Sequence, residues 1–432
     1  MDQPGPANAN DDNQELDNRL NEIDIHEVDE DSTDSGEGSI IFVNEDEARV
    51  EELVEADDGV VIDDDNSDDM DLGEAEEVNG YINEDRVGGN HPLIRFSGHT
   101  GSVFWCDIHP NDNTCAVTGG EDDRAFIWNI STGEVLFECK NHSDSVTHVG
   151  FNFDGTYVAT GDMKGLIQVW KLFDAEPVWS EKVDELQWLL WHKETNILFA
   201  AEKSGAIYIW KIPNGQCKLI PGYGAGTECG MLMPDGKRLV VGYTNRSIRV
   251  FDLKAETVIA HYKPQAEIEE SATDIDVLAD NTNFVAGFTD GVVLVGSTWS
   301  SKTLFEVDTK TKVESVRFIS HDTAPLIAVG SSNGVDIWDY SKKVLRHSIE
   351  SSPINRMLYD TTRQMIYAGG VAGEVYVISC LSGSIIYYFV GHRHNILHLE
   401  ISKDRCKLLS ASEDTRSNVY DLTVLDALGC SH

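Results

Sequence analysis

Two stretches of the chain contain residue types that often form a metal or ligand site. Histidines gather at His392, His394 and His398, and histidine is a common zinc ligand. Residues 221–226 read PGYGAG, which has the glycine content of a phosphate-binding loop. Neither stretch has the other residues that such a site requires. No cysteine or carboxylate has a fitting spacing from the histidines, and no helix is predicted after the glycines. We therefore predict a connecting loop at 221–226 and no bound metal.

Other signs of catalysis are also missing. The chain lacks the GxxxxGK[ST] and HExxH motifs, and its eight cysteines are dispersed without a C-x-x-C pair. In a protein of a reducing compartment, cysteines dispersed in this way typically serve as small core residues. We predict a protein without a cofactor and without enzymatic activity. An enzyme, the remotest alternative, would need a catalytic group of residues on its loops.

Charge divides the chain into two parts. The whole chain carries 75 acidic and 33 basic residues, and residues 1–90 alone hold 32 acidic and 3 basic ones. Such a segment cannot bury enough apolar surface to offset its ordering entropy, so we predict a disordered acidic arm over 1–90. It could be a solubilising tail, a tether that contacts a basic client through the apolar islands 39–43 and 60–62, or a shield for a basic patch on the folded part.

The net charge of −42 also limits the possible partners. It repels nucleic-acid phosphates and anionic lipid, so we expect a basic protein or peptide client and no direct nucleic-acid binding. No apolar run approaches the ~20 residues of a membrane span, and the first residues lack a signal-peptide pattern. We therefore expect a cytoplasmic protein that does not insert into membranes and that is a monomer.

From residue 93 onward, short β-branched and aromatic runs alternate with Gly, Asp, Asn and Ser turns, which predicts an all-β repeat array. One position recurs every 40 to 45 residues, as expected for propeller blades. It is occupied by Trp128, Trp170, Trp210, Phe251, Gly296, Trp338, Ile378 and Tyr420. Eight such positions predict an eight-bladed β-propeller over 91–424, followed by a short tail at 425–432. A seven-bladed ring would require one unit to be misassigned, and the unit with Gly296 is the weakest.

The first unit, residues 98–129, begins with Gly-His and ends with Trp-Asn. In this respect the chain resembles the WD-repeat β-propeller family, over about residues 93–424. In that family a His, a Ser or Thr, an Asp and the Trp form a hydrogen-bonded network that holds each blade. The resemblance assigns this structural role to His99, Thr118, Asp122 and Trp128 in the first unit, to His142, Thr160 and Trp170 in the second, and to His392, Ser410, Asp414 and Tyr420 in the last.

Departures from the family pattern begin in the second unit, where Lys164 replaces the Asp. In the middle units Ser204, Asn245 and Val371 occupy or adjoin that position, and the Gly-His pairs are missing. We therefore expect the first and last blades to be the most rigid. Residues 93–96 form one strand without a blade of its own, and we predict that it closes the ring as the outer strand of the last blade.

Propellers commonly bind peptides on the rim formed by the loops that lead into each first strand and by the turns before each third strand. The acidic candidates there are Glu121, Asp123, Asp144, Asp184, Glu185, Glu269, Glu270 and Glu413. They are either a solvated charged surface or a cradle for a basic peptide, and the sign of the whole chain favours the cradle. Trp105, Trp188 and Trp191 lie on predicted first strands, where packing between blades is favoured over a role as binding anchors.

Within the family, residues 116–151, 158–170 and 233–254 resemble a eukaryotic group whose animal member is linked to cell migration and vessel formation. That group is similar in architecture to a fungal chaperone that holds the basic N-terminus of a large-subunit ribosomal protein on a negatively charged propeller face. The resemblance implies protein binding without enzymatic activity. The function that we predict is a chaperone or escort for a basic client such as a ribosomal protein, and the alternative is a signalling scaffold in cell migration.

Overall fold

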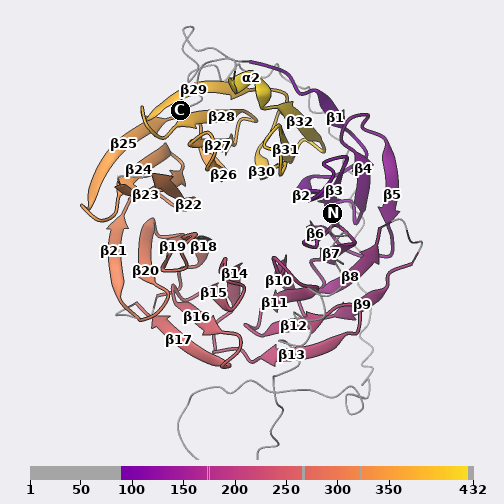
Figure 1. The fold of residues 1–432 in the computed structure, drawn as a ribbon, viewed down its shortest axis with the longest axis horizontal. Coiled ribbons are helices and arrows are strands. Elements are labelled where there is room, and N and C mark those ends of the chain that lie inside the picture. The colour runs from indigo at the N-terminus through magenta and orange to yellow at the C-terminus, as the bar shows by residue number, and fades with distance from the viewer. Residues whose placement is uncertain (1–88, 173, 175, 265–267, 322–323, 427–432) are drawn as a thin grey trace, which may run out of the picture. The chain divides into compact units, whose positions relative to one another are not determined.

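The computed structural model of the chain describes residues 89–426, except 173, 175, 265–267 and 322–323. Apart from its last two residues, the predicted acidic arm lies outside the described residues, as do residues 427–432 of the predicted tail. Within the described ranges, thirty-two strands form eight four-stranded antiparallel sheets. The sheets stand side by side around a ring (Figure 1). The eight-bladed all-β propeller predicted from the repeat is confirmed.

Seven blades are each built from four consecutive strands. The first blade comprises β2 (Val103–Ile108), β3 (Cys115–Gly120), β4 (Ala125–Asn129) and β5 (Val135–Cys139). The second comprises β6 (Val146–Phe151), β7 (Tyr157–Asp162), β8 (Leu166–Lys171) and β9 (Trp179–Lys182). The third comprises β10 (Leu186–Trp191), β11 (Ile197–Glu202), β12 (Ile207–Lys211) and β13 (Gln216–Ile220). The fourth comprises β14 (Thr227–Leu232), β15 (Arg238–Tyr243), β16 (Ile248–Asp252) and β17 (Thr257–Tyr262).

The remaining blades complete the circle. The fifth comprises β18 (Ala272–Val277), β19 (Asn283–Phe288), β20 (Val292–Ser297) and β21 (Thr303–Asp308). The sixth comprises β22 (Val313–His321), β23 (Ala324–Ser331), β24 (Gly334–Asp339) and β25 (Val344–Glu350). The seventh comprises β26 (Ile354–Asp360), β27 (Met365–Gly370), β28 (Val375–Ser379) and β29 (Ser384–Phe389). The eighth comprises β30 (Ile396–Ile401), β31 (Lys407–Ser412), β32 (Ser417–Asp421) and, from the other end of the propeller, β1 (Ile94–Phe96).

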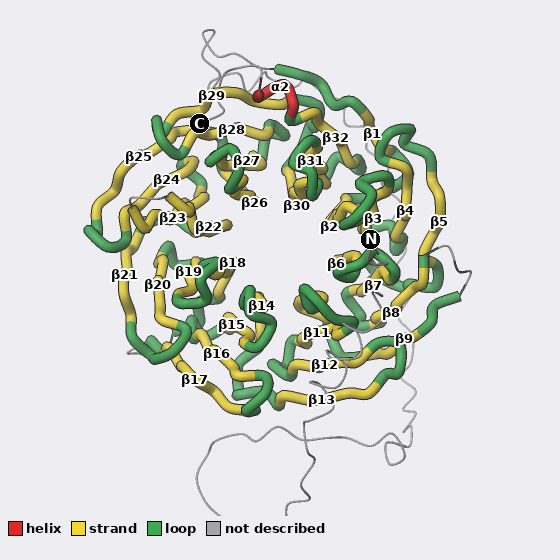
Figure 2. The backbone as a smooth tube through the Cα atoms, viewed as in Figure 1, coloured by secondary structure: helices red, strands yellow, loops and turns green. Residues whose placement is uncertain are grey.

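In the first seven blades the strand that comes first in the chain lies nearest the ring centre and the fourth lies at the circumference (Figures 1 and 2). In the eighth blade β30 lies nearest the centre and β1 lies at the circumference. The second strands are the most buried, and every residue of β3, β15 and β27 is buried. This agrees with their sequences, which are nearly continuous apolar and small residues, because both faces of such a strand pack against neighbouring blades. Residues 221–226 form the loop between β13 and β14, as predicted.

The ring closes through β1, as the sequence predicts. Ile94 pairs with Val419 and Phe96 with Ser417 on β32, so the strand becomes the outer strand of the eighth blade. The ring of Phe96 stacks on that of Trp128 in the first blade, with centroids 4.6 Å apart and planes 2° from parallel. The closing strand therefore joins the last blade by backbone pairing and the first blade by side-chain packing.

Gly296, the residue that made the fifth blade doubtful, lies in strand β20, where it pairs with Phe284 on β19 and follows an irregularity in the pairing with β21. A Cβ atom on Gly296 would lie 2.5 Å from the ring of Phe284 and 2.7 Å from that of Tyr262. The ring of Phe284 on the neighbouring strand β19 and that of Tyr262 on β17 of the fourth blade thus fill the space next to Gly296. The seven-bladed alternative is excluded, because this unit forms a complete four-stranded sheet.

Candidate functional site

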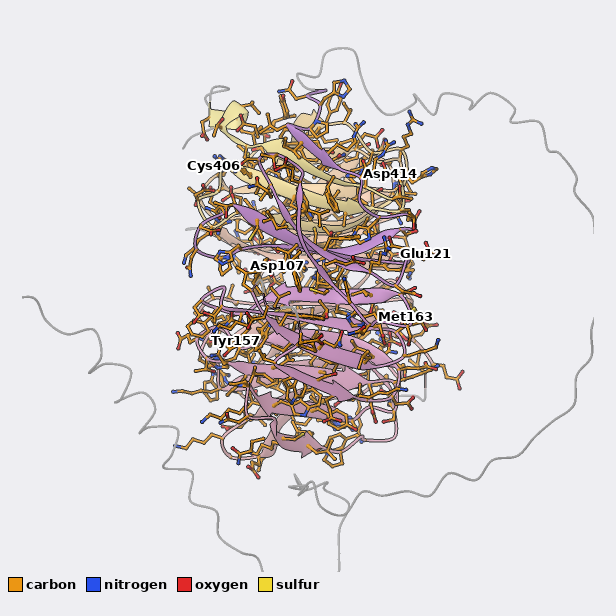
Figure 3. The ribbon with its side chains drawn as sticks, turned by 90° about the vertical axis from the view of Figure 1, so that its right-hand side faces the viewer. Asp107, Glu121, Tyr157, Met163, Cys406 and Asp414 are labelled. Atoms are coloured by element: carbon orange, nitrogen blue, oxygen red, sulfur yellow. The ribbon has the colours of Figure 1, made fainter. Side chains whose placement is uncertain are left out.

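The loops between strands divide the ring into two faces. We call the face with the loops that lead into the first strands, and with the turns between second and third strands, the upper face. Figure 3 shows Glu121, Met163 and Asp414 along this side, whereas Tyr157 and Cys406 lie along the opposite, lower face. All eight acidic rim candidates lie in upper-face loops or at their ends: Glu121, Asp123, Asp144, Asp184, Glu185, Glu269, Glu270 and Glu413.

Two of these carboxylates are neutralised by lysines of their own neighbourhood. Asp144 lies 3.5 Å from the Nζ of Lys164, and Glu185 lies 2.5 Å from that of Lys203. The hydrogen bond to Glu185 raises the pKa of Lys203 above its usual value. The acidic excess of the upper face is therefore smaller than the sequence indicates, and it rests on the other candidates.

Three of the remaining candidates are held in place by hydrogen bonds. Glu121 accepts one from the backbone N–H of Ser102 at 3.0 Å, and hydrogen bonding to Ser102 lowers the pKa of this carboxyl. Glu270 accepts one from the hydroxyl of Thr289 at 2.6 Å, and Glu413 one from the amide of Asn395 at 3.3 Å. These contacts reduce the side-chain entropy that a bound ligand would otherwise have to remove.

The blade network of the first unit exists, with one change from the family pattern. His99 Nδ1 lies 2.8 Å from Asp122, and its Nε2 lies 3.0 Å from the hydroxyl of Thr118. Although burial acts to raise it, the hydrogen bond with His99 keeps the pKa of Asp122 below its usual value. The buried Nε1 of Trp128 has no hydrogen-bond partner among the described residues, and its ring is held by stacking on Phe96.

The prediction that the second unit lacks the acidic member was wrong. Asp162, the last residue of β7, lies 3.1 Å from His142 Nδ1, and Thr160 lies 2.8 Å from His142 Nε2. The indole N–H of Trp170 donates to Thr160 at 3.2 Å, which completes the network. The acid stands two residues after the Thr rather than four, and Lys164 instead pairs with Asp144 in the loop above.

The same position carries an acid in the third blade, where the sequence offered only Ser204. Glu202, the last residue of β11, accepts hydrogen bonds from the hydroxyls of Ser204 and Tyr208 and from the backbone N–H of Asp184. In both the second and the third blade, the acidic residue of the network is therefore the last residue of the second strand. This position in the sequence could have been used to predict Asp162 and Glu202. The Glu202 contact also fixes the backbone of Asp184, one of the rim candidates.

The last blade retains its histidine network. His392 Nδ1 lies 3.0 Å from both oxygens of Asp414, and its Nε2 lies 2.7 Å from Ser410. Tyr420 accepts a hydrogen bond from the amide of Asn418 at 3.2 Å. His392 thus belongs to the blade network. His398 has a different role: it lies on the inner strand β30 and stacks on Trp105, with ring centroids 3.9 Å apart.

The three tryptophans of the inner strands all contact other blades. Trp105 of the first blade packs on His398 of the eighth and on His148 of the second. Trp188 is buried, and its ring lies 2.7 Å from the Cβ position of Gly230 in the fourth blade. The indole of Trp191 donates to the carbonyl of Gly150 in the second blade at 3.1 Å. Each ring is thus engaged in contacts between blades.

The chain also contains one match to a serine-nucleophile motif that was not predicted from the sequence. Residues 330–334 read GSSNG, which matches G-x-S-x-G with Ser332 at the central position. A nucleophile of that type requires a sharp turn from a strand into a helix. Here Ser332 lies in the hairpin turn between β23 and β24, so the surroundings do not fit that chemistry.

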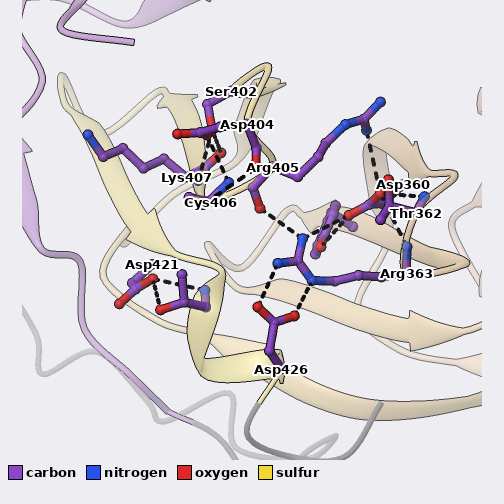
Figure 4. Close-up of polar contacts among 12 residues, drawn as sticks. Asp360, Thr362, Arg363, Ser402, Asp404, Arg405, Cys406, Lys407, Asp421 and Asp426 are labelled. Atoms are coloured by element: carbon purple, nitrogen blue, oxygen red, sulfur yellow. Dashed lines mark hydrogen bonds and ion pairs between the residues drawn. The ribbon is translucent and has the colours of Figure 1, made fainter. Parts of the chain in front are cut away.

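On the lower face, the short helix α2 (Thr423–Asp426) is attached to the seventh blade (Figure 4). Arg363 binds both oxygens of Asp426, at 2.8 and 3.1 Å, and also Asp360 at 3.1 Å. None of the helices in the described part of the chain is long and apolar enough to cross a membrane. The lower face here is a structural ion-pair network between consecutive blades.

A cavity of about 450 Å³ opens at the upper mouth of the central channel. Its walls come from the second residues of five inner strands, including Glu228 of β14, Glu314 of β22 and Asn355 of β26. The rest of the lining comes from nearby loop and strand residues, namely Ser271, Ala272, Thr289, Lys312 and Arg356. The upper face thus combines fixed acidic side chains on the rim with a polar cavity at its centre, a combination suited to binding a peptide.

Comparisons with known proteins agree with this architecture. The family model "WD domain, G-beta repeat" matches residues 90–129 and 133–171. Angio-associated migratory cell protein of Homo sapiens is 36% identical over 345 residues, which cover 76% of this chain and 79% of that protein. Ribosome assembly protein SQT1 of Saccharomyces cerevisiae is 22% identical over 410 residues, covering 81% of this chain and 92% of that protein.

Among solved structures, the Chaetomium thermophilum Sqt1 bound to the N-terminus of the ribosomal protein L10 has the same fold. It superposes with a TM-score of 0.69 at 18% identity and covers 77% of this chain and 100% of that one. At that identity the likeness concerns the fold alone, whereas the likeness to the human protein spans most of both chains. The chain is therefore a member of the angio-associated migratory cell protein family of WD-repeat propellers.

Proposed function

We propose that this propeller is a non-enzymatic cytoplasmic escort that holds a basic client, such as a ribosomal protein, on its upper face. The observation that carries the proposal is a set of exposed upper-face carboxylates that have no lysine partner within the described part of the chain. Among them are Glu121 and Glu413, whose side chains are oriented by hydrogen bonds. Carboxylates held in this way attract lysine and arginine and discriminate against acidic partners.

Two comparisons support the ribosomal client. The fungal Sqt1 propeller, which shares this fold, was solved with the N-terminus of ribosomal protein L10, and its yeast counterpart is named as a ribosome assembly protein. The net charge of −42 has the sign that complements a basic client. A soluble escort with this charge would also keep such a client from binding nucleic acid before it is delivered.

The test is charge reversal with a matched control on the other face. The double variant Asp184→Lys with Glu269→Lys reverses two exposed upper-face acids, and Glu134→Lys with Glu194→Lys reverses two exposed lower-face acids. Binding of a labelled Lys/Arg-rich peptide should weaken at least about tenfold in the first and should change little in the second. The peptide should also bind more weakly at high salt. Equal binding to both variants would contradict the proposal.

A second function is supported by a separate observation. The 36% identity to angio-associated migratory cell protein, whose name refers to migratory cells, favours a scaffold in cell migration. Depletion of the protein separates the two functions. Loss of migration with normal levels of ribosomal proteins would favour the scaffold, whereas loss of one basic ribosomal protein before any migration defect would favour the escort.

A further inference from the structure

One strand at the circumference of the ring offers an open and partly apolar edge. β25 has seven residues and is the longest of the described outermost strands. It pairs with β24 on its inner side, and within the described residues no strand pairs with its outer edge. Val344 and Leu345 at its start are 50% and 40% exposed. An exposed apolar strand edge is a template on which a further strand can pair.

The same edge is basic. Lys342, Lys343 and Arg346 are all exposed and lie on either side of the two apolar residues. The buried carboxylate of Asp339 contacts Arg346 at 2.6 Å and Lys342 at 3.7 Å. Three cations thus gather around one acid at the start of β25, in a chain whose net charge is −42. This edge therefore favours an acidic strand as its occupant.

The outer strand of the first blade provides a contrast. β5 also begins with two exposed apolar residues, Val135 and Leu136. The charges beside them are those of Glu134 and Glu138, and residues 131–139 contain no Lys or Arg. An acidic strand would be repelled from β5 and attracted to β25. Charge therefore discriminates between two apolar edges of similar exposure.

The acidic arm contains a segment of complementary composition. Residues 60–62 read VVI and are followed directly by DDD at 63–65. The edge has the reverse order, because its lysines at 342–343 precede the apolar residues 344–345. An antiparallel pairing therefore places apolar residues opposite apolar residues and acids opposite bases.

The arm also joins the folded part close to this edge. The backbone N–H of Gly89 donates to the carbonyl of Tyr388 at 3.0 Å, on the outer strand β29 of the seventh blade. Tyr388 packs against a core cluster that includes Ile349 of β25, and the two outer strands are neighbours on the circumference (Figure 1). Residues 66–88 can span roughly 75 Å when extended, which is ample for this connection. A tether of this kind raises the effective concentration of the segment to about the millimolar range.

We propose that residues 60–65 of the acidic arm pair with the outer edge of β25 as an antiparallel fifth strand of the sixth blade. The VVI residues cover Val344 and Leu345, and the aspartates that follow pair with Lys342 and Lys343. This inference goes beyond the proposed function, because it assigns the arm to the circumference. The arm then shields an exposed strand edge and leaves the upper-face acids open to a client.

Hydrogen exchange of the full chain tests the contact with the edge. Pairing protects the outward N–H groups of β25, so they should exchange at least about threefold faster in the variant Val60→Ser with Ile62→Ser. Residues 135–139 of β5 serve as the internal control and should not change. Unchanged exchange of β25 in this variant would overturn the proposal.

The matched control variant alters the other apolar island of the arm. Ile40→Ser with Phe42→Ser removes apolar residues of the same arm, but it leaves residues 60–65 intact. The exchange of β25 should equal that of the unchanged chain. If this variant accelerated β25 as much as the first one does, the assignment to residues 60–65 would be wrong.

Charge exchange tests the ion pairs. A carbodiimide couples a carboxylate to an amine that it contacts, so the unchanged chain should give crosslinks between residues 63–65 and Lys342 or Lys343. Lys342→Glu with Lys343→Glu should abolish these crosslinks and accelerate the exchange of β25. Adding Asp64→Lys with Asp65→Lys should restore both. If the lysine variant left β25 exchange unaltered, the cations would only guard the edge and the proposal would be overturned.

A mixture of isotope-labelled and unlabelled protein identifies the chain that supplies the strand. Crosslinks within one isotopic form support pairing of the arm with its own propeller. Crosslinks between the two forms would show that a second copy covers the edge, which would overturn the assignment. Binding of the Lys/Arg-rich peptide at the upper face is measured separately, so a failure of this inference leaves the proposed function standing.

Discussion

In the second blade, Asp162 lies 3.1 Å from the Nδ1 of His142, although the residue at the family position of that acid is Lys164. Both side chains of the pair are fully buried. Asp162 also accepts hydrogen bonds from the backbone N–H groups of Leu166 and Ser143, at 3.0 and 3.4 Å. One carboxylate thus joins the loop that leads into the blade to the turn between its second and third strands.

This relationship predicts an asymmetry between two neighbouring substitutions. Asp162→Ala should lower the free energy of unfolding by about 2–3 kcal/mol, because it leaves His142 and two backbone donors without their acceptor. Lys164→Ala should cost about 0–1 kcal/mol, since its ion pair with Asp144 is exposed. Urea unfolding of both variants checks this. Equal costs would show that Asp162 does not hold the blade.

A second prediction concerns ring closure. Phe96→Ala removes the stacking on Trp128 and leaves a cavity between the first and last blades, which should cost about 3–5 kcal/mol. Leu93→Ala, three residues earlier and 58% exposed, should cost less than about 0.5 kcal/mol. Thermal unfolding measures both. If Phe96→Ala were as mild as the control, closure would depend on the backbone pairing of β1 alone.

A third prediction is a pH dependence from the central channel. Burial raises the pKa of Asp107 to about 7, and burial together with the Asp107 charge raises that of Glu400 to about 8. Both exceed the values of about 4 in an unfolded chain, so the folded state binds more protons between about pH 4 and 8. The free energy of unfolding should therefore fall as the pH rises through this window.

The matching experiment replaces both carboxyls by amides. Asp107→Asn with Glu400→Gln keeps acceptors for the backbone N–H groups of Phe151 and Ile401 and removes the titration. It gives up the contact with the N–H of Ile108, a loss that does not depend on pH. The variant should gain stability relative to the unchanged protein at pH 8.5 and should gain none at pH 4. A difference that stays constant over this range would contradict the assignment.

A fourth prediction concerns the fifth blade. Gly296→Ala should cost about 1–3 kcal/mol, because its Cβ would overlap the rings of Phe284 and Tyr262. Gly150→Ala is the control, since the nearest atom to its Cβ position is 3.6 Å away. Chemical unfolding should show a loss for the first variant and little change for the second. A neutral Gly296→Ala would mean that the two aromatic rings move easily.

Much of the architecture could be predicted because a propeller is local. Each blade is a meander of strands joined by short turns, so the period of the anchor residues and the turn residues before the third strands determine the number and order of blades. The closing role of 94–96 followed from a strand left over at one end and a strand missing at the other. The upper-face location of Glu121, Asp184 and Glu413 followed from their places within the repeat.

Other features depended on contacts between residues far apart in the chain. By its position in the repeat, Lys164 occupies the place of the blade's acidic residue in the second unit. In the folded chain, Asp162 instead lies next to His142. The cavity draws its walls from inner strands of different blades, and the sharing of Asp274 between Arg317 and Arg356 joins the fifth, sixth and seventh. By itself the sequence determined the ring, its closure and the face that carries the acids, because these follow from local pairing. Only the tertiary structure decided which charged side chains pair with one another, because the distance between two charges and their burial set the energy of the interaction.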